Sequence, residues 1–236
     1  MLEIQGIDTW RGQAQILHKV SLEVRERESV VLVGRNGAGK TTTIDSIIGL
    51  LPLRAGKVSF QGQEISRLPP HRRARLGIGY APEDAGLFPD LTVEENFQIC
   101  RLLAQRAGRG AQAAEADDRV YGLFPEVRQL MRRPGLYLSG GQKKMVAIGR
   151  AMMLSPSVLL LDEPFEGLAP VVVTRLIEAV RKIKEMKIAV LIAESNLANA
   201  TRVADRLYAI DRGEIIYHGD PRKVLENKEV MSTIHG

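Results

Sequence analysis

Two patterns of apolar and polar residues run along the chain, and each predicts its own kind of β-strand. In the first pattern, apolar and polar residues alternate, which indicates strands with one buried face. This alternation occurs at residues 2–4, 20–24 and 58–60. The second pattern is almost entirely apolar and occurs at residues 29–34, 157–162 and 188–194. Continuous apolar runs of this length are typical of parallel strands that are covered on both faces.

Helical patterns follow each apolar run. Residues 41–51 follow the first, and Pro170, beyond the second, stands where a first helical residue would be. Apolar residues then recur at helical spacing, at Val173, Leu176, Ile177, Val180 and Ile183. Residues 196–207 are less regular but still helical, and residues 208–220 are typical of a β-hairpin that turns at Arg212–Gly213. The alternation of strands and helices predicts a doubly wound α/β core.

Residues 89–150 have a different composition from the rest of the chain. Thr92 and Glu95 form the sequence pattern of a helix capping box. Gly108 and Gly110 interrupt the helical pattern, which resumes over residues 111–124 and ends at Pro125. This block lacks clear strands, so we expect a helical subdomain inserted into an α/β core formed by residues 1–88 and 151–236.

The sequence GRNGAGKT, from Gly34 to Thr41, matches the phosphate-loop pattern G-x-x-x-x-G-K-[ST]. Its glycines allow backbone N–H groups to point inward, and the following helix contributes its positive N-terminus. Lys40 would contact the β- and γ-phosphates, and the Thr41 hydroxyl would bind Mg²⁺. An apolar strand before the loop and a helical pattern after it support a nucleotide site.

Two acids, Asp162 and Glu163, stand at the end of the second apolar run. Ligands of open α/β sheets lie at the carboxyl ends of the strands, so these acids should face the phosphate loop. We expect Asp162 to hold Mg²⁺, directly or through water, and Glu163 to act as general base on the attacking water.

A second anion site is predicted at Ser139, Gly140 and Gly141, which precede another helical pattern. Backbone N–H groups at a helix N-terminus and a serine hydroxyl are suitable donors to a phosphate. A single nucleotide needs only one such cradle, and a capped helix after a glycine turn would also explain these residues.

Composition adds few restrictions. The chain has 236 residues, of which 44% are apolar and 26% charged, and a formal net charge of +5. A basic cluster lies at residues 71–75, but no groove-reading motif or interleaving of aromatic and basic residues supports nucleic-acid binding. A single cysteine, Cys100, allows no intrachain disulfide and fits a reducing compartment, and no apolar run reaches the length of a bilayer span.

The order of the phosphate loop, LSGGQ at 138–142 and VLLLDEP at 158–164 resembles the nucleotide-binding subunits of ABC transporters. This resemblance covers nearly the whole chain, so we expect residues 1–236 to form a single nucleotide-binding domain. It implies a P-loop NTPase α/β fold with a parallel-sheet core, an antiparallel β part and the inserted helical subdomain. It also implies ATP hydrolysis with Mg²⁺ in a head-to-tail dimer, in which the LSGGQ segment of one subunit caps the γ-phosphate held by the other.

The resemblance assigns further roles to single residues. Trp10 is similar to the aromatic residue that stacks on adenine, and Glu83 replaces the usual glutamine that senses Mg²⁺ and the membrane subunit. Ala169 replaces an aspartate that usually contacts the partner, so that contact is not expected here. The implied ATP-binding residues are Trp10, Gly34, Arg35, Asn36, Gly37, Ala38, Gly39, Lys40, Thr41 and Thr42. The implied signature residues acting on the partner's ATP are Ser139, Gly140, Gly141 and Gln142, and the implied metal ligands are Thr41, Glu83 and Asp162.

Ser195, in the polar end of the third apolar run, occupies the position of a histidine that contacts the γ-phosphate in most of the family and orients the catalytic glutamate. Serine cannot carry a positive charge and has one hydroxyl donor. We therefore expect Ser195 to be a catalytic position with weakened chemistry, so that ATP hydrolysis at this subunit's own site is slow or depends on the partner.

Several segments resemble the LivF-like branch, which serves importers of branched-chain amino acids and related solutes. They are APED at 81–84, LFPDLTVEEN at 87–96, GLAP at 167–170 and residues 219–230. This branch implies a peripheral location at the cytoplasmic face of the membrane. Its partners would be a second, LivG-like nucleotide-binding subunit, two membrane permeases and, indirectly, a solute-binding protein, with no nucleic acid.

Other functions stay open. Importers of urea, amides or aromatic acids use close relatives, and exporters of lipid or lipopolysaccharide share the LDEPF segment. A soluble ABC-type ATPase acting on DNA or ribosomes usually has a long coiled coil or two cassettes, neither of which is found here. A GTPase would need Asn-Lys-x-Asp, but residues 227–230 read NKEV.

Overall fold

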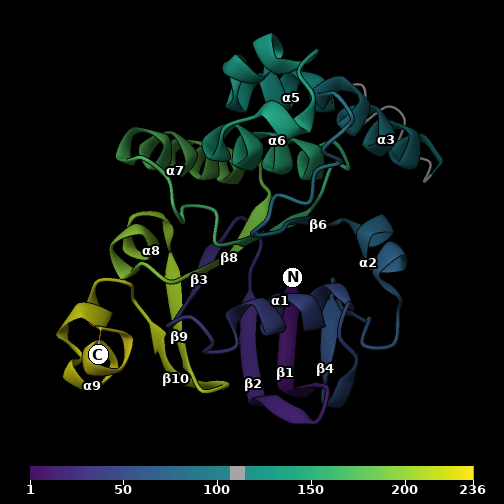
Figure 1. Ribbon diagram of the computed structural model, residues 1–236. Helices are drawn as coiled ribbons and strands as arrows, with labels where there is room; N and C mark the ends of the chain where they lie inside the picture. The colour runs from purple at the N-terminus through teal and green to yellow at the C-terminus, as the bar shows by residue number, and fades with distance from the viewer. Residues whose placement is uncertain (107–114, 236) are drawn as a thin grey trace.

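A computed structural model describes residues 1–106 and 115–235, which form two β-sheets and helices on both faces of the larger sheet (Figure 1). The antiparallel sheet has the strand order β2-β1-β4-β5. Its strands are β1 (Leu2–Arg11), β2 (Ala14–Val24), β4 (Leu53–Phe60) and β5 (Gln63–Glu64). The three segments with alternating polarity all lie in this sheet, as expected for strands with one buried face.

The second sheet has six strands in the order β10-β9-β3-β8-β7-β6. They are β10 (Glu214–Gly219), β9 (Arg206–Asp211), β3 (Ser29–Val33), β8 (Ala189–Glu194), β7 (Val158–Asp162) and β6 (Ile78–Ala81). All pairs are parallel except β10 with β9. The predicted mixed α/β fold with a parallel sheet and an antiparallel part is therefore confirmed, and the three apolar runs are the central strands β3, β8 and β7.

Helices cover both faces of the parallel sheet. They are α1 (Lys40–Ile48), α2 (Pro70–Leu76), α3 (Val93–Arg106), α5 (Ala116–Leu123), α6 (Gly140–Met152), α7 (Pro170–Glu185), α8 (Leu197–Val203) and α9 (Lys228–His235). Short 3-10 turns lie at Pro125–Leu130, Gly135–Tyr137 and Lys223–Glu226. In Figure 1, α3, α5, α6 and α7 lie above the parallel sheet, while α1 lies between it and the antiparallel sheet.

Alternate residues of the central strands supply two hydrophobic cores. Val31 and Val33 of β3 pack with the upper helices, whereas Val30 and Leu32 pack with α1 and the antiparallel sheet. A strand whose residues belong alternately to two cores has no solvent-facing side, which is why its sequence is apolar throughout.

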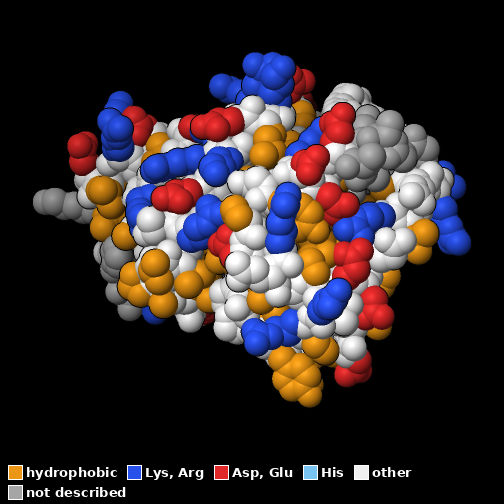
Figure 2. Space-filling model, turned by 90° about the horizontal axis from the view of Figure 1, so that it is seen from above, with side chains coloured by type: hydrophobic (Ala, Val, Ile, Leu, Met, Phe, Trp, Pro, Cys, Tyr) orange, Lys and Arg blue, Asp and Glu red, His pale blue; other side chains and the backbone are white. Residues whose placement is uncertain are grey.

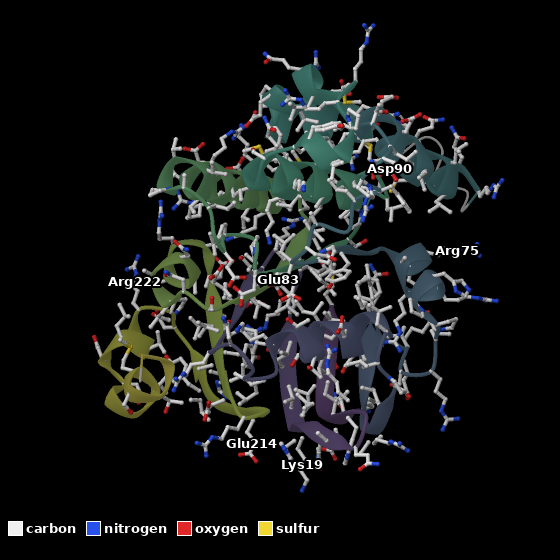
Figure 3. All side chains as sticks on the ribbon, viewed as in Figure 1. Lys19, Arg75, Glu83, Asp90, Glu214 and Arg222 are labelled. Carbon is white, nitrogen blue, oxygen red and sulfur yellow. The ribbon has the colours of Figure 1, made fainter. Side chains whose placement is uncertain are left out.

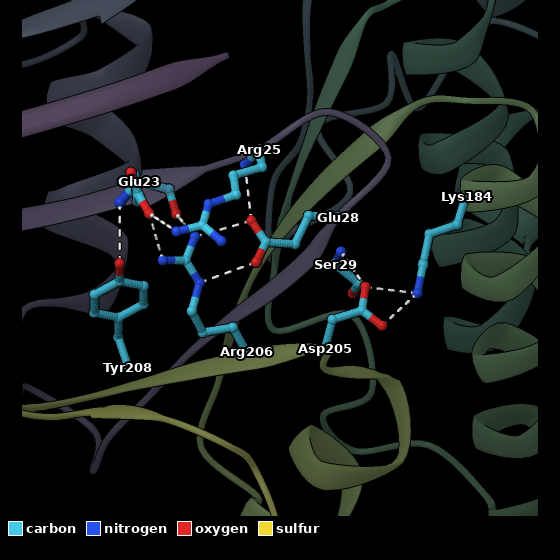
Figure 4. Close-up of polar contacts among 8 residues, drawn as sticks. All are labelled: Glu23, Arg25, Glu28, Ser29, Lys184, Asp205, Arg206 and Tyr208. Carbon is cyan, nitrogen blue, oxygen red and sulfur yellow. Dashed lines mark hydrogen bonds and ion pairs between the residues drawn. The ribbon is translucent and has the colours of Figure 1, made fainter.

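The amino-terminal edge of the parallel sheet is held by a polar network (Figure 4). Arg206 at the start of β9 pairs with Glu23 (2.7 Å) and with Glu28 (2.9 Å). Lys184 of α7 pairs with Asp205 at 2.6 Å. These contacts fix the sheet at one edge and leave the carboxyl ends of its strands for the phosphate loop.

Two helix predictions are confirmed at their starts. Thr92 and Glu95 form the capping box, since Glu95 N–H donates to the Thr92 hydroxyl (3.2 Å) and Glu95 Oε2 accepts from Thr92 N–H (2.8 Å). Pro170 is the first residue of α7. The predicted hairpin turn at Arg212–Gly213 is confirmed between β9 and β10.

One boundary prediction is wrong. The helix expected over 196–207 ends at Val203, and Arg206 already pairs with Val30 in the sheet. The Asp205 carboxylate accepts the Ser29 N–H (2.9 Å), which holds this segment against β3.

The predicted division at 89–150 stays a prediction, although α6 continues to Met152, past its boundary. Of the helix expected over 111–124, the structure describes α5, while Gly108, Gly110 and residues 111–114 lie outside the described residues.

Candidate functional site

A cavity of about 540 Å³ opens at the carboxyl ends of β3 and β7, where the sequence places the phosphate loop and the two acids. Its lining comes from the antiparallel sheet, the phosphate loop and the loops after β6 and β7. The lining residues are Arg11, Ile16, Asn36, Gly37, Gly39, Lys40, Thr41, Thr42, Glu83, Glu163 and Glu166. The fold thus brings together residues that are more than a hundred positions apart in the sequence.

The phosphate loop is curled over its own lysine. Lys40 Nζ donates to the carbonyls of Gly34 (2.8 Å) and Arg35 (3.1 Å). Gly39, at the start of α1, has φ +109°, and a Cβ there would lie 2.9 Å from Leu17 Cδ2. Only glycine adopts this backbone without strain in so little space. The loop therefore presents the N-terminus of α1 and a buried cation to the cavity.

Lys40 also pairs with the predicted base. Its Nζ lies 3.0 Å from Glu163 Oε1, and both side chains are about 95% buried. The second oxygen of the same carboxylate accepts from the Ser195 N–H (3.0 Å) and the Ser195 hydroxyl (3.2 Å). Ser195 follows β8 and Glu163 follows β7, and these strands are direct neighbours. The carboxylate is thus held between a lysine and a serine at the ends of adjacent strands.

Thr41 and Asp162 form the second pair of predicted partners. The Thr41 hydroxyl donates to Asp162 Oδ1 at 3.2 Å. Burial and, to a lesser extent, the charge of Glu163 raise the pKa of Asp162 to about 6, although the Thr41 hydrogen bond acts in the opposite direction. Within the described part of the chain, the buried Asp162 Oδ2 has no hydrogen-bond partner. A carboxylate oxygen free of protein partners beside a hydroxyl is a donor set that suits Mg²⁺.

Glu83 lines the same cavity from the loop after β6. Figure 3 shows it near the centre of the molecule, between the upper helices and the β layers. Glu83, Glu163 and Glu166 all line the cavity, so its wall is rich in carboxylates. A divalent cation would reduce the repulsion among these groups.

Arg11 is a site residue for which the sequence analysis made no prediction. Its guanidinium donates to the Thr42 hydroxyl (3.1 Å) and to Asp45 Oδ2 (2.5 Å) in the first turns of α1. No motif marks Arg11; the only signal is its position at the end of β1, beside Trp10.

The structure does not bring Trp10 into the cavity. Arg11 and Ile16 line the wall on this side, and the half-buried Trp10 is not among the lining residues. Adenine stacking by Trp10 stays a prediction.

The signature residues lie apart from the cavity. Ser139 caps α6, because its hydroxyl accepts from the Gln142 N–H (3.3 Å) while Gln142 Oε1 accepts from the Ser139 N–H (3.0 Å). Ser139 and Gly140 are exposed, whereas Gly141 is buried where a Cβ would lie 2.8 Å from Val172 Cγ1. Ala169 precedes α7 and offers no side-chain cap. Ser139–Gln142 do not line the cavity of their own chain.

Comparison with known proteins gives consistent results. Residues 17–166 match the model of the ABC transporter family. The chain is 34% identical to the high-affinity branched-chain amino acid transport ATP-binding protein BraG of Pseudomonas aeruginosa, over 100% of both chains. It is 37% identical to the lipopolysaccharide export system ATP-binding protein LptB of Escherichia coli, over 94% of this chain and 91% of LptB. A solved nucleotide-free ATP-binding cassette from an ABC transporter matches with a TM-score of 0.87 at 27% identity, covering 100% of this chain and 98% of the other.

Proposed function

Because the chain belongs to the ABC transporter family, as an ATP-binding subunit that hydrolyses ATP, we propose that it energises the uptake of branched-chain amino acids or a related small solute. The observation that carries the importer assignment is the similarity to BraG over the full length of both proteins. The LivF-like segments of the sequence agree with this assignment.

The geometry supports a specific division of roles in hydrolysis. When ATP binds, Lys40 would exchange its ion pair with Glu163 for contacts with the β- and γ-phosphates. The Glu163 carboxylate would then be free to accept a proton from water. Ser195 would keep that carboxylate in place through its two hydrogen bonds. Thr41, Asp162 and Glu83 would hold Mg²⁺, which neutralises charge on the phosphates when bound.

Glu163→Gln tests the base. The amide cannot accept the proton, so turnover should fall by at least ~100-fold, while ATP binding measured by equilibrium dialysis persists. Glu166→Gln is the matched control, because Glu166 lines the same cavity but is not paired with Lys40 or Ser195. Normal turnover of Glu163→Gln would exclude Glu163 as the base.

The serine at position 195 supports the proposal that this site is slow or partner-dependent. Its hydroxyl reaches Glu163, but it brings no positive charge to the γ-phosphate. Ser195→His should raise the ATPase rate. An unchanged rate, together with full activity of a homodimer of the wild-type chain, would contradict this proposal.

We further propose that Ser139–Gln142 act on the nucleotide of a second, LivG-like subunit, since these residues do not line their own cavity. The same proposal includes two membrane permeases, a peripheral place at the cytoplasmic face and, indirectly, a solute-binding protein. No helix among residues 1–106 and 115–235 is both long and apolar enough to cross a bilayer. The surface formed by the upper helices α3, α5, α6 and α7 carries a mixture of basic, acidic and apolar side chains (Figure 2). Such a mixture favours a protein partner over a purely anionic lipid surface.

Lipopolysaccharide export is the second candidate, because LptB is 37% identical to this chain. Affinity purification of the chain with its native membrane partners separates the two functions. Importer permeases, followed by ATPase stimulation by branched-chain amino acids in the reconstituted complex, would support uptake. Recovery of a lipid-extracting membrane subunit would refute it.

A further inference from the structure

Lys144 is a half-buried cation near the candidate site, and the roles above assign it no function. It lies in the second turn of α6, the helix that begins at the signature residues. Its Nζ donates to the backbone carbonyl of Glu163 at 2.6 Å and to that of Glu83 at 2.7 Å. One side chain therefore joins the signature helix to the loops that follow β6 and β7.

The backbone of Glu163 needs such support. Its φ is +45°, a left-handed conformation that is strained for a residue with a side chain and persists only where the surroundings hold it. The Glu163 N–H donates to the Ala193 carbonyl (3.0 Å), and the carbonyl on its other side accepts from Lys144. The Lys144 bond thus fixes the peptide unit that follows the predicted base.

The electrostatic surroundings favour a lysine at this place. Burial lowers the pKa of Lys144, while the negative charges of Glu83 and Glu166 act in the opposite direction. A cation among these carboxylates reduces their mutual repulsion, which an uncharged side chain would not do.

We propose that Lys144 is a positioning residue, which holds the carbonyls of Glu163 and Glu83 so that the general base and the Glu83 loop move together with the signature helix. The inference rests on the proposed role of Glu163 in ATP hydrolysis. Ser139–Gln142 are proposed to contact the partner's nucleotide, whereas Glu163 acts on the nucleotide of its own chain. Lys144 therefore connects the residues that contact one ATP with the base that acts on the other.

The test uses the full chain and the variant Lys144→Met, which keeps an unbranched side chain but removes the donors. Turnover should fall about 10- to 100-fold, as expected for a misplaced catalytic group, with the KM for ATP nearly unchanged. Hydrogen–deuterium exchange should become faster in residues 82–86 and 163–166 and stay unchanged in the phosphate loop. Lys144→Arg, which keeps the charge and the donors, should recover much of the turnover.

Lys143→Met is the matched control, because it removes the neighbouring charge on the same helix and should change neither measurement. Equal effects of Lys143→Met and Lys144→Met, or unchanged exchange in both segments, would overturn the inference. If Lys144→Met does not fold, Lys144→Ala gives the same comparison, because it also removes the donors. Absence of hydrolysis by the wild-type chain in its native complex would instead count against the proposed function, and exchange alone would then decide the role of Lys144.

Discussion

The turn between β9 and β10 supports the phosphate loop from behind. Gly213 donates its N–H to the Ala38 carbonyl of that loop and accepts the N–H of His18 from β2, both at 2.9 Å. Its φ is +80°, and a Cβ at this position would lie 1.8 Å from the Ile16 carbonyl oxygen. A Gly213→Ala side chain therefore cannot be accommodated unless the turn moves, which stretches both hydrogen bonds.

Gly62 offers a closely matched control in the turn between β4 and β5. Its φ is +79°, it follows Gln61 with φ +51° as Gly213 follows Arg212 with φ +45°, and a Cβ there would meet nothing within 4 Å. Alanine carries the left-handed backbone cost of ~1–2 kcal/mol at either position. Only Gly213→Ala also weakens two backbone hydrogen bonds, each with a net contribution of about 1 kcal/mol.

We therefore expect Gly213→Ala to lower the free energy of unfolding by about 2 kcal/mol more than Gly62→Ala. Urea unfolding measures this difference directly, and thermal melting should show it as a Tm that is roughly 4–8 °C lower. ATP affinity should fall for Gly213→Ala alone, because the Ala38 carbonyl belongs to the phosphate loop. Equal stability of the two variants would refute the claim that this turn supports the loop.

Three further predictions concern other parts of the chain. Arg73→Met should lower the free energy of unfolding, measured in urea, by about 3 kcal/mol. The reason is that the buried guanidinium donates to the Ser46 and Ile47 carbonyls at the end of α1. A loss no larger than that of Arg72→Met would contradict this prediction. Burial raises the pKa of Glu194 from 4.5 to about 7, so its contribution to stability is complete below about pH 4.5 and is lost as the pH rises through 7. Glu194→Gln should flatten this dependence in urea unfolding between pH 5 and 8, and an unchanged slope would exclude Glu194 as its source. Trp10→Ala should raise the KM for ATP more than it changes kcat, whereas an unchanged KM would mean that Trp10 does not contact the nucleotide.

The sequence predicts the phosphate loop and its acids well, because local chemistry and strand ends determine them. The apolar run before Asp162 identifies a central strand, and carboxyl ends of parallel strands meet at one edge. The run before Ser195 has the same property, and the pairing of β7 with β8 places Ser195 against Glu163 as expected for neighbouring strands.

Contacts that depend on packing between distant elements have no comparable signal. In the sequence, Lys144 is one of two adjacent lysines in a predicted helix. Its two carbonyl partners follow different strands, so no local pattern indicates these contacts. Arg11 is one polar residue at a strand end, and Gly213 is an ordinary hairpin glycine in sequence. The wrong helix boundary after Val203 has the same cause. The helical pattern of the sequence continues to residue 207, but the pairing of Arg206 with Val30 in the sheet ends the helix earlier.

The strand order has a consequence for synthesis of the chain. β3, which leads into the phosphate loop, lies between β8 and β9, so both of its sheet neighbours are made more than 150 residues later. Pairings so distant in sequence form slowly, because a long loop must close before they stabilise the chain. The phosphate loop therefore leaves the ribosome well before β8 and β9, the two strands that flank β3 in the sheet. We therefore expect ATP to stabilise the chain only after β8 and β9 have been made and have paired with β3.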